Sequence, residues 1–484
     1  MNLRSRTYNA LLWSLVDQGG EQLIRFIFSL ILARVLIPEQ FGLIGIAYVF
    51  TEVAREFVNS GFGMALIRKV NSSIVDECSV FYFNIFIGAV GTIFIYLTSP
   101  YIGQFYRSEE LVSVLKLLSF NVIIGSFGTI HTIRFVKSLD FKSQTQIGLP
   151  ATIISGLIGI LLAFNGYGVW ALALQSILRT TILTLLLWKV NKWRPKLLFS
   201  FKSLSDMFTF GSKLLVGSIL QKVFDNIYTV IIGRMYSSSL VGYFTRAKQT
   251  QQLPITTLWT IIGRVYFPVL SVLKDDYLKF NRALEKAALN ISFLVFPSLV
   301  LVTICAPNLF LFLFGSNWNQ SVPIFQILCI GSLFLPIEKL NLNALLANGK
   351  SSTVLKLNTF KQTAILLSAF FTSNLGIMPM LYSFAIISFL MFTITSYMIR
   401  HTQHYTLVKQ FTQQIPCACC TTIMGVFIIL TNQITLKKEY LLILQFVVGI
   451  TVYLGSAYLL KLRALFDNID LVFTLLNKKP PVIA

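Results

Sequence analysis

The sequence predicts an all-α polytopic membrane protein of about 14 transmembrane helices with both termini in the cytoplasm. Three observations predict this fold class: an apolar composition, a series of apolar stretches long enough to span a bilayer, and basic residues concentrated in alternate loops. Hydrophobic residues make up 55% of the 484 residues and charged residues 12%. Soluble proteins carry about twice that share of charged residues, so a soluble protein is excluded.

Each predicted span is an apolar stretch of about 20 residues, the length at which a helix crosses a hydrocarbon core of about 30 Å. The predicted spans are residues 11–36, 41–62, 79–98, 111–133, 145–164, 167–188, 206–233, 240–263, 287–306, 322–347, 354–375, 378–399, 415–431 and 440–460. The connections between them are short, so no folded extramembrane domain is expected. The first stretch lacks the cleavage site of a secretory signal peptide.

The distribution of lysine and arginine predicts the topology. If the N-terminus lies inside, 25 of the 40 basic residues fall in inside segments, 5 in outside segments and 10 within spans. This bias follows the positive-inside rule and predicts an N-in, C-in arrangement. It also explains the formal charge of +21, so no nucleic-acid partner is expected.

A short motif recurs at an offset of 200 residues. Residues 31–34 (ILAR) precede Gly42, and residues 231–234 (IIGR) precede Gly242. Six spans separate the copies, which predicts two parallel six-helix bundles related by an axis along the membrane normal. The predicted domains are an N-terminal six-helix lobe at 1–188, a basic cytoplasmic linker at 189–205, a C-terminal six-helix lobe at 206–400, and two additional helices with a cytoplasmic tail at 401–484.

Charged residues within the spans gather on the first two helices of each predicted bundle. In the first span Asp17, Glu21 and Arg25 are spaced four apart and therefore share one helical face. An arginine or aspartate facing lipid at the bilayer centre costs at least about 2.5 kcal/mol, so these groups are expected to face other helices or a hydrated cavity. The pattern predicts a central cleft lined by both bundles.

Two sets of residues are candidates for function. The cationic site predicted for an anionic substrate comprises Arg25, Arg55, Lys222 and Arg246. Arginine suits this role because its planar guanidinium stays charged and binds phosphate oxygens in pairs. The candidates for coupling a proton or sodium ion are Asp17, Glu21, Asp225 and Glu338. For the same residues an alternative stays open, in which the pairs Arg25–Glu21, Arg55–Glu52 or Arg55–Glu56, and Lys222–Asp225 hold helices together.

Other polar residues allow simpler interpretations. Lys116, Arg179 and Lys361 lie nearer to span ends and are expected to extend toward the membrane interface. An asparagine cluster (Asn341, Asn343 and Asn348) could bind sugar hydroxyls or form interhelical hydrogen bonds, and both interpretations stay open.

No cofactor, resident metal or catalytic residue is predicted, because the sequence contains no Walker loop, no HExxH motif and no strand-associated GxGxxG. A zinc site would draw on His401, His404, Cys417, Cys419 and Cys420, but their spacing matches no standard zinc motif. The cysteines are expected to be free and to pack as small hydrophobic residues.

Five motifs carry a family resemblance. They are FGLIGIAYVFTEVAREFVNSGFGMALIRK at 41–69, GYGVWALALQ at 166–175, FTFGSKLL at 208–215, GYFTRAKQTQQLP at 242–254 and FPVLS at 267–271. The chain resembles the polysaccharide transporter family, the O-antigen flippase-type lipopolysaccharide biosynthesis proteins of the multidrug/oligosaccharidyl-lipid/polysaccharide exporter superfamily. The resemblance is continuous from the N-terminus to about residue 350.

The resemblance implies a flippase rather than an enzyme. Its substrate would be undecaprenyl-pyrophosphate-linked oligosaccharide, an O-antigen, capsule or exopolysaccharide repeat unit, moved by alternating access to the periplasmic leaflet of a bacterial inner (plasma) membrane. It also implies a coupling cation, membrane lipid along the last two spans, and a glycan polymerase or other assembly machinery as partners. Related lipid II flippases use arginines on the first, second and eighth helices, which here carry Arg25, Arg55 and Arg246, and Arg55 aligns closely.

Two alternatives come from other classes of function. A cation or drug antiporter of the same superfamily should have an acidic or aromatic cavity, whereas the spans hold ten basic and six acidic residues. A non-transporting membrane scaffold for glycan assembly would not need its intramembrane charges.

Overall fold

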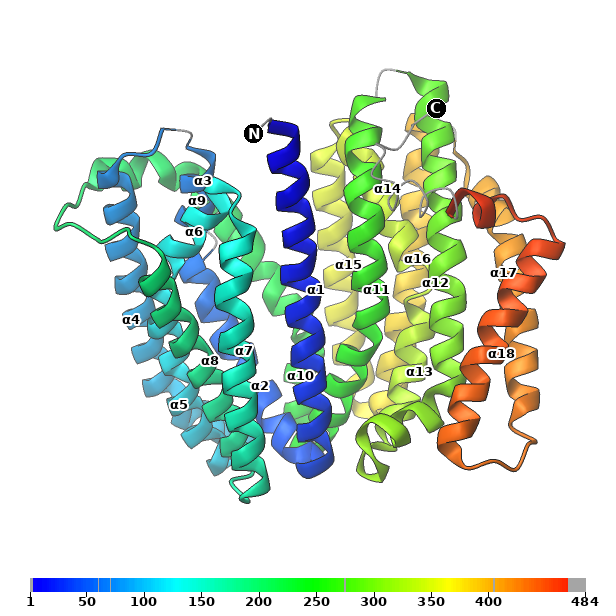
Figure 1. The fold of residues 1–484 in the computed structure, drawn as a ribbon, viewed down its shortest axis with the longest axis horizontal. Coiled ribbons are helices and arrows are strands. Elements are labelled where there is room, and N and C mark those ends of the chain that lie inside the picture. Colours follow the sequence, from blue (N-terminus) through cyan, green and yellow to red (C-terminus); the bar gives the residue numbers. More distant parts are fainter. Residues whose placement is uncertain (1–2, 60, 70, 274–275, 404, 469–484) are drawn as a thin grey trace. The chain divides into compact units, whose positions relative to one another are not determined.

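The computed structural model describes residues 3–59, 61–69, 71–273, 276–403 and 405–468, and every regular element within these ranges is a helix. The chain divides into two compact units, Met1–Thr245 and Arg246–Ala484. Figure 1 labels the helices in chain order.

The first unit consists of ten helices and the start of an eleventh in its described residues. They are α1 (Leu3–Val35), α2 (Pro38–Asn59), α3 (Phe62–Arg68), α4 (Ile74–Tyr106), α5 (Glu109–Ser126), α6 (Thr129–Ser138), α7 (Phe141–Phe164), α8 (Val169–Val190), α9 (Phe201–Asp225), α10 (Ile227–Met235) and the first residues of α11 (Ser238–Val272). Helix α1 packs on α7, α7 packs on α8, and α5 packs on α2, α4 and α8.

Local sequence signals set the ends of these helices. Ser73 begins α4 with a capping box, in which its hydroxyl accepts a hydrogen bond from the Asp76 backbone N–H at 3.1 Å while Asp76 accepts from the Ser73 N–H at 2.9 Å. Helix α4 ends at Arg107, whose left-handed φ of 56° stops the helix. Helix pair α5–α6 is bent by 46° and pair α9–α10 by 41°, so each pair can form one bent span.

The linker predicted at 189–205 is fixed to the first unit. The Lys196 N–H donates to Cys78 Sγ at 3.3 Å, and the Ser200 N–H donates to Ser79 Oγ at 2.9 Å. Trp193 is buried with Phe62 and other apolar side chains of α3, α4 and α6. Helix α9 then packs on α2, α3 and α4, so the division between the compact units lies within α11 and not at the linker. The lobes at 1–188 and 206–400 stay predictions.

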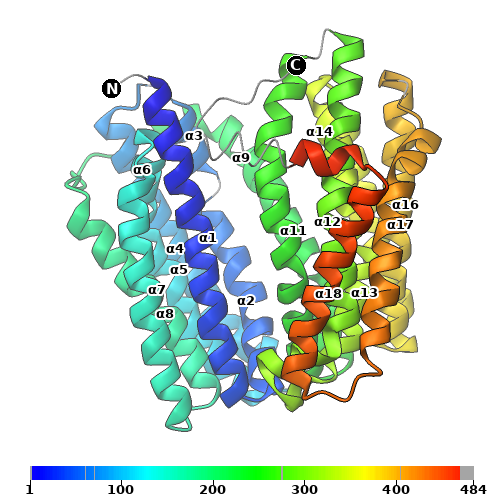
Figure 2. The ribbon, with the colours of Figure 1, turned by 45° about the vertical axis from the view of Figure 1, so that its right-hand side comes forward.

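The second unit contains the rest of α11 and the helices that follow it. They are α12 (Tyr277–Phe314), η1 (Ser316–Trp318), α13 (Ser321–Gly331), α14 (Leu335–Ala347), α15 (Ser351–Thr372), η2 (Ser373–Leu375), α16 (Ile377–Gln403), α17 (Leu407–Thr431) and α18 (Lys438–Leu459). Helices α17 and α18 lie side by side and both pack on α12, as Figure 2 shows in orange, red and green.

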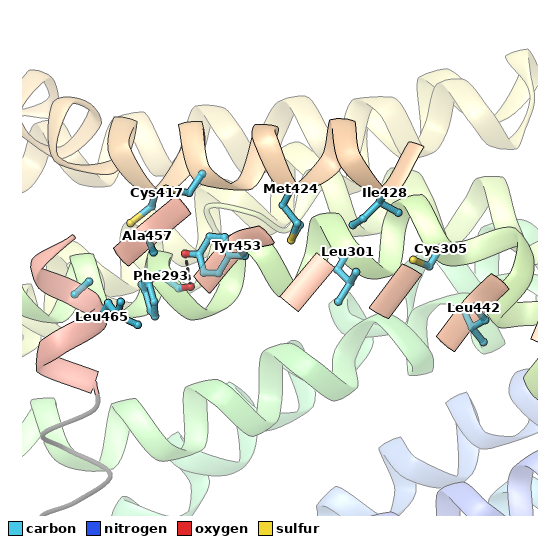
Figure 3. Packing of buried hydrophobic residues seen from close by; sticks show 12 residues of the cluster. Phe293, Leu301, Cys305, Cys417, Met424, Ile428, Leu442, Tyr453, Ala457 and Leu465 are labelled. Carbon is cyan, nitrogen blue, oxygen red and sulfur yellow. Dashed lines mark hydrogen bonds between the residues drawn. The ribbon is translucent and has the colours of Figure 1, made fainter. Parts of the chain in front are cut away.

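A buried cluster joins α12, α17 and α18 (Figure 3). Phe293 and Leu301 of α12 pack with Met424 of α17 and Tyr453 of α18. The Tyr453 hydroxyl donates to the Phe293 carbonyl oxygen at 2.8 Å, which satisfies its only polar group within the apolar interior. The two C-terminal helices are therefore packed onto the second unit rather than attached to it loosely.

The observed helices coincide with the predicted spans. Each predicted span overlaps one long helix or two consecutive helices. Among the described residues, eight helices are long and apolar enough to cross a membrane, or ten if each bent pair counts as one span. Helices α1, α2, α11 and α15 complete the series and carry more charge. The count of fourteen, the internal repeat and the N-in topology stay predictions.

Candidate functional site

A group of charged side chains links α1, α7 and α8 of the first unit, and we call it the Glu21 cluster (Glu21, Arg25, Thr152 and Arg179). The Glu21 carboxylate forms ion pairs with Arg25, at 3.6 Å, and with Arg179. The Thr152 hydroxyl donates to Glu21 Oε1 at 3.0 Å and accepts from Arg179 Nε at 3.2 Å. Two guanidinium groups thus share one carboxylate, and the cluster has an excess of positive charge.

A second group, the Glu52 cluster (Glu52, Arg55, Glu56 and Lys222), links α2 and α9. Arg55 Nη1 lies 3.1 Å from Glu52 Oε1. Lys222 Nζ lies 3.5 Å from Glu52 Oε2 and 4.0 Å from Glu56 Oε1. Lys222 therefore reaches from α9 to two carboxylates of α2, and the charges of this cluster balance.

Tyr48 of α2 connects the two clusters. Its side chain lies close to Ser176 of α8 and within electrostatic range of Glu52, Arg55 and Arg179. Both clusters therefore belong to one polar region, built from α1, α2, α7, α8 and α9. Within the part of the chain that the structure describes, the two clusters contribute four cationic and three anionic side chains to this region.

The exposed fraction distinguishes the members of this polar region. The Arg25 side chain is 54% exposed and the Arg55 side chain 41%, whereas the Glu21 side chain is 15% exposed. The carboxylate that holds the Glu21 cluster together is thus largely covered, whereas the Arg25 and Arg55 side chains are exposed to a larger extent. This arrangement can present positive charge to an anionic ligand.

The structure contains two of the predicted local ion pairs, Arg25–Glu21 and Arg55–Glu52, and adds three longer-range ones, which involve Arg179 and Lys222. Arg179 does not extend toward the interface as expected but pairs with Glu21, because both side chains lie where α1, α7 and α8 meet. Lys222 pairs with α2. The side chain of Asp17 lies outside the described residues, and Asp225 is exposed at the end of α9.

The second unit holds a buried ion pair. Glu338 of α14 is 2% exposed, and its two carboxylate oxygens accept hydrogen bonds from Lys361 Nζ of α15 at 2.8 and 2.7 Å. The expectation that Lys361 extends to the interface is therefore wrong, because Glu338 provides a charged partner inside the helix bundle. Glu338 remains a candidate for ion coupling.

Asn341 lies one turn after Glu338 and is completely buried. Its amide donates to Ser396 Oγ of α16 and to Gln410 Oε1 of α17, each at 3.1 Å. Ser396 also donates to Gln410 Oε1 at 2.8 Å. The structure therefore shows Asn341 in interhelical hydrogen bonds, which is the second of the two interpretations.

Arg246, the fourth member of the predicted cationic site, belongs to the second unit. It is buried, and its guanidinium lies 5.0 Å from the ring centroid of Phe314 and 5.1 Å from that of Trp318. This geometry is typical of a cation–π interaction. The grouping of Arg246 with Arg25, Arg55 and Lys222 stays a prediction.

The histidines and cysteines near α17 are the candidates for metal binding. Among the described residues, no group of three or more His, Cys, Asp and Glu side chains is placed to hold a metal ion. All six cysteines are free thiols, and Cys417 and Cys420 are buried in the cluster of α12, α17 and α18. His404 lies outside the described residues.

Comparison with known proteins identifies the family. A family model described as "Polysaccharide biosynthesis protein" matches residues 31–323. The chain belongs to this polysaccharide biosynthesis protein family. Its relatives include the teichuronic acid biosynthesis protein TuaB of Bacillus subtilis (strain 168), which is 24% identical over 84% of this chain and 85% of TuaB. The lipopolysaccharide biosynthesis protein WzxC of Escherichia coli (strain K12) is 25% identical over 75% of this chain and 74% of WzxC.

Solved structures show the fold of this family member. The lipid II flippase MurJ, in an inward closed conformation, has a TM-score of 0.74 at 17% identity and covers 93% of this chain and 98% of MurJ. An inward-facing multidrug resistance MATE transporter of the MOP superfamily has a TM-score of 0.63 at 14% identity, over 82% of this chain and 95% of the transporter. The resemblance inferred from the sequence is thus confirmed, and the protein is a multi-pass membrane protein with the fold of this superfamily.

The activities named among these proteins are transport activities. A further relative, 22% identical over 68% of both chains, is the succinoglycan biosynthesis transport protein ExoT of Rhizobium meliloti (strain 1021). These named activities agree with the prediction that the chain is a transporter and not an enzyme.

Proposed function

We propose that the protein is a flippase for lipid-linked oligosaccharide in polysaccharide biosynthesis. Its substrate is a repeat unit of O-antigen, capsule or exopolysaccharide carried on undecaprenyl pyrophosphate, which it moves from the cytoplasmic to the periplasmic leaflet of a bacterial inner membrane. The family, the transport protein among its relatives and the fold shared with a lipid II flippase support this proposal.

The observation that carries the proposal is the Glu21 cluster. Two guanidinium groups share one largely covered carboxylate, and the Arg25 side chain is 54% exposed, so Arg25 can be reached by an anionic headgroup. A pyrophosphate headgroup needs such charge-assisted hydrogen bonds to leave water, and arginine supplies them in pairs. Arg55 adds a second exposed guanidinium in the same polar region.

The same cluster provides a means of coupling transport to protons. Protonation of Glu21 removes the negative charge that Arg25 and Arg179 share, and both guanidinium groups then have more positive charge available for phosphate. Loss of the proton restores the ion pairs and weakens the hold on the substrate. Alternating access follows if the two protonation states favour different conformations.

An antiporter for cationic drugs fits this region less well. Such a site needs a carboxylate whose charge is left for the substrate. Here Glu21, Glu52 and Glu56 each lie within 4.0 Å of a cationic side chain of the protein. Among the described side chains of the two clusters, four are cationic and three are anionic, which favours an anionic substrate.

The proposal is tested by flipping of a defined undecaprenyl-pyrophosphate-linked oligosaccharide in liposomes that contain the purified protein. Arg25→Ala and Arg55→Ala are each expected to lower the flipping rate about ten-fold or more, the effect of losing a hydrogen bond to a charged group. Lys213→Ala is the matched control, because Lys213 is an exposed cation on α9 outside both clusters.

The flipping rate of a variant is compared with the wild-type rate only if the variant inserts into the membrane and has the wild-type unfolding temperature. Wild-type rates for both arginine variants would reject the cationic site. Absence of flipping by the wild-type protein, in liposomes where a known flippase is active on the same substrate, would reject the function itself.

A further inference from the structure

A second cationic feature lies at one end of the first unit, away from the Glu21 and Glu52 clusters. It is a pocket of about 530 Å³ between the start of α4 and the C-terminal ends of α6 and α8, and we call it the linker pocket. Its polar lining comprises Ser72, Glu77, Arg134, Lys137, Ser138, Asn191 and Lys192. The predicted topology places this end on the cytoplasmic side.

The charges in the linker pocket leave a positive excess. Three cationic side chains and one carboxylate line it. Arg134 Nη1 lies 2.6 Å from Glu77 Oε2, so this pair is neutral, and the excess charge comes from Lys137 and Lys192. Lys192 is exposed and can turn toward a ligand.

Lys137 is held in place before any ligand arrives. Its ammonium donates to the Lys69 carbonyl oxygen at 2.7 Å and to Ser72 Oγ at 2.6 Å. An ammonium has three N–H donors, so these two bonds fix its position and leave a third for an anion. A fixed cation loses little conformational entropy on binding, which favours affinity.

The wall that carries Lys192 is also ordered. Asn191 ends α8, its N–H donating to the Leu187 carbonyl at 3.0 Å, and its side-chain oxygen accepts from the Trp193 N–H at 3.0 Å. Arg194 donates to the Asn191 carbonyl at 2.7 Å, and Trp193 is buried in the core. Lys192 thus extends from a backbone that is fixed on both sides.

Apolar side chains at the edge of the pocket indicate the kind of anion. Val190 lines the pocket and is 47% exposed, and Leu139, next to the lining residue Ser138, is 51% exposed. A soluble anion would gain no apolar contact from these side chains, whereas the acyl chains of a lipid would contact them while its phosphate occupies the pocket. Basic pockets between helices at the cytoplasmic side are suited to lipid headgroups.

We propose that the linker pocket binds the phosphate group of an anionic phospholipid from the cytoplasmic leaflet. Lys137 and Lys192 bind the phosphate, and Val190 and Leu139 contact the first part of the lipid chains. This site is separate from the proposed substrate site, so it does not depend on the flippase function. Bound lipid would hold the linker against α4 and α6.

The test uses the full-length protein purified in a nonionic detergent, with lipid binding measured by native mass spectrometry. The probes are phosphatidylglycerol, phosphatidylcholine and inorganic phosphate. Lys192→Gln and Lys137→Gln are each expected to weaken phosphatidylglycerol binding about five-fold, the contribution of one basic side chain near a membrane surface. Lys196→Gln is the matched control, because Lys196 is an exposed lysine of the same segment that does not line the pocket.

The expected result is selective. Phosphatidylglycerol binds more tightly than phosphatidylcholine, Lys196→Gln leaves binding unchanged, and inorganic phosphate at the lipid concentration does not displace the lipid. Equal losses for Lys192→Gln and Lys196→Gln would overturn the proposal in favour of diffuse surface charge. Displacement by inorganic phosphate would overturn the lipid assignment in favour of a soluble anion. Because Lys192 is exposed, its replacement keeps the test valid even if Lys137→Gln fails to fold.

Discussion

Gly42 and Gly242 meet near the starts of α2 and α11, where neither residue can carry a side chain. A Cβ on Gly42 would lie 1.7 Å from the Ser238 carbonyl oxygen and 3.1 Å from the Gly242 nitrogen, and a Cβ on Gly242 would lie 1.9 Å from the Pro38 carbonyl oxygen. The contact is reciprocal, since Pro38 and Ser238 are also 200 residues apart. It joins the two copies of the repeat motif, and the repeat itself stays a prediction.

Alanine at either glycine is expected to destabilise the protein. The added methyl group overlaps a backbone carbonyl, which cannot rotate away as a side chain can, so the two helix starts must separate. Overpacking of this kind costs about 1–3 kcal/mol and should lower the unfolding temperature measured in detergent. Gly217→Ala is the control, because a Cβ at Gly217 meets no atom within 4 Å. An unchanged unfolding temperature for Gly42→Ala would contradict the close contact.

Glu21→Gln should separate substrate binding from proton coupling. Glutamine keeps the oxygen that accepts the Thr152 hydrogen bond but cannot take up a proton, and it permanently removes the charge shared by Arg25 and Arg179. We expect flipping in liposomes to continue without a pH gradient and to lose its acceleration when a gradient is applied. Glu109→Gln, at an exposed carboxylate at the start of α5, should respond to the gradient like the wild type. Full gradient dependence in Glu21→Gln would assign coupling to another carboxylate.

Removing one partner of the buried Glu338–Lys361 pair should lower the free energy of unfolding considerably more than removing both charges. Lys361→Gln leaves a carboxylate without its charged partner in the interior, an effect of about 3–5 kcal/mol. The double variant Glu338→Gln/Lys361→Gln removes both charges and should recover most of that loss, as a double-mutant cycle of unfolding free energies would show. Lys356→Ala, at an exposed position on the same helix, serves as the control. Additive losses would mean that the two side chains do not interact.

Thiol chemistry distinguishes free cysteines from a zinc site. Cys419 is exposed, whereas Cys78, Cys305, Cys329, Cys417 and Cys420 are buried. N-ethylmaleimide should therefore modify Cys419 well before the other five, as peptide mass spectrometry would detect. A zinc chelator should neither change this order nor lower the unfolding temperature. A zinc site would instead protect Cys417, Cys419 and Cys420 from N-ethylmaleimide, and a chelator would remove that protection. This result would contradict the prediction of free thiols.

The sequence was sufficient to predict the helices because each apolar stretch must satisfy its own backbone within the bilayer, and a helix does so locally. Local spacing also predicted Arg25–Glu21 and Arg55–Glu52, which lie one turn apart. The pairing of Arg179 with Glu21 could not be predicted, because it depends on α1 and α8 both packing on α7, which brings together two residues 158 positions apart. Likewise, nothing near Arg246 in the sequence indicates the rings of Phe314 and Trp318, which a later helix and turn supply.

The hydrogen bonds of Lys196 and Ser200 to α4 have a practical consequence for engineering this transporter. A segment between two halves of a protein is the usual choice for an epitope or fluorescent insertion, yet here an insertion would pull Trp193 out of its apolar surroundings. The exposed turn at 432–437, between α17 and α18, tolerates added chain better because its side chains face outward.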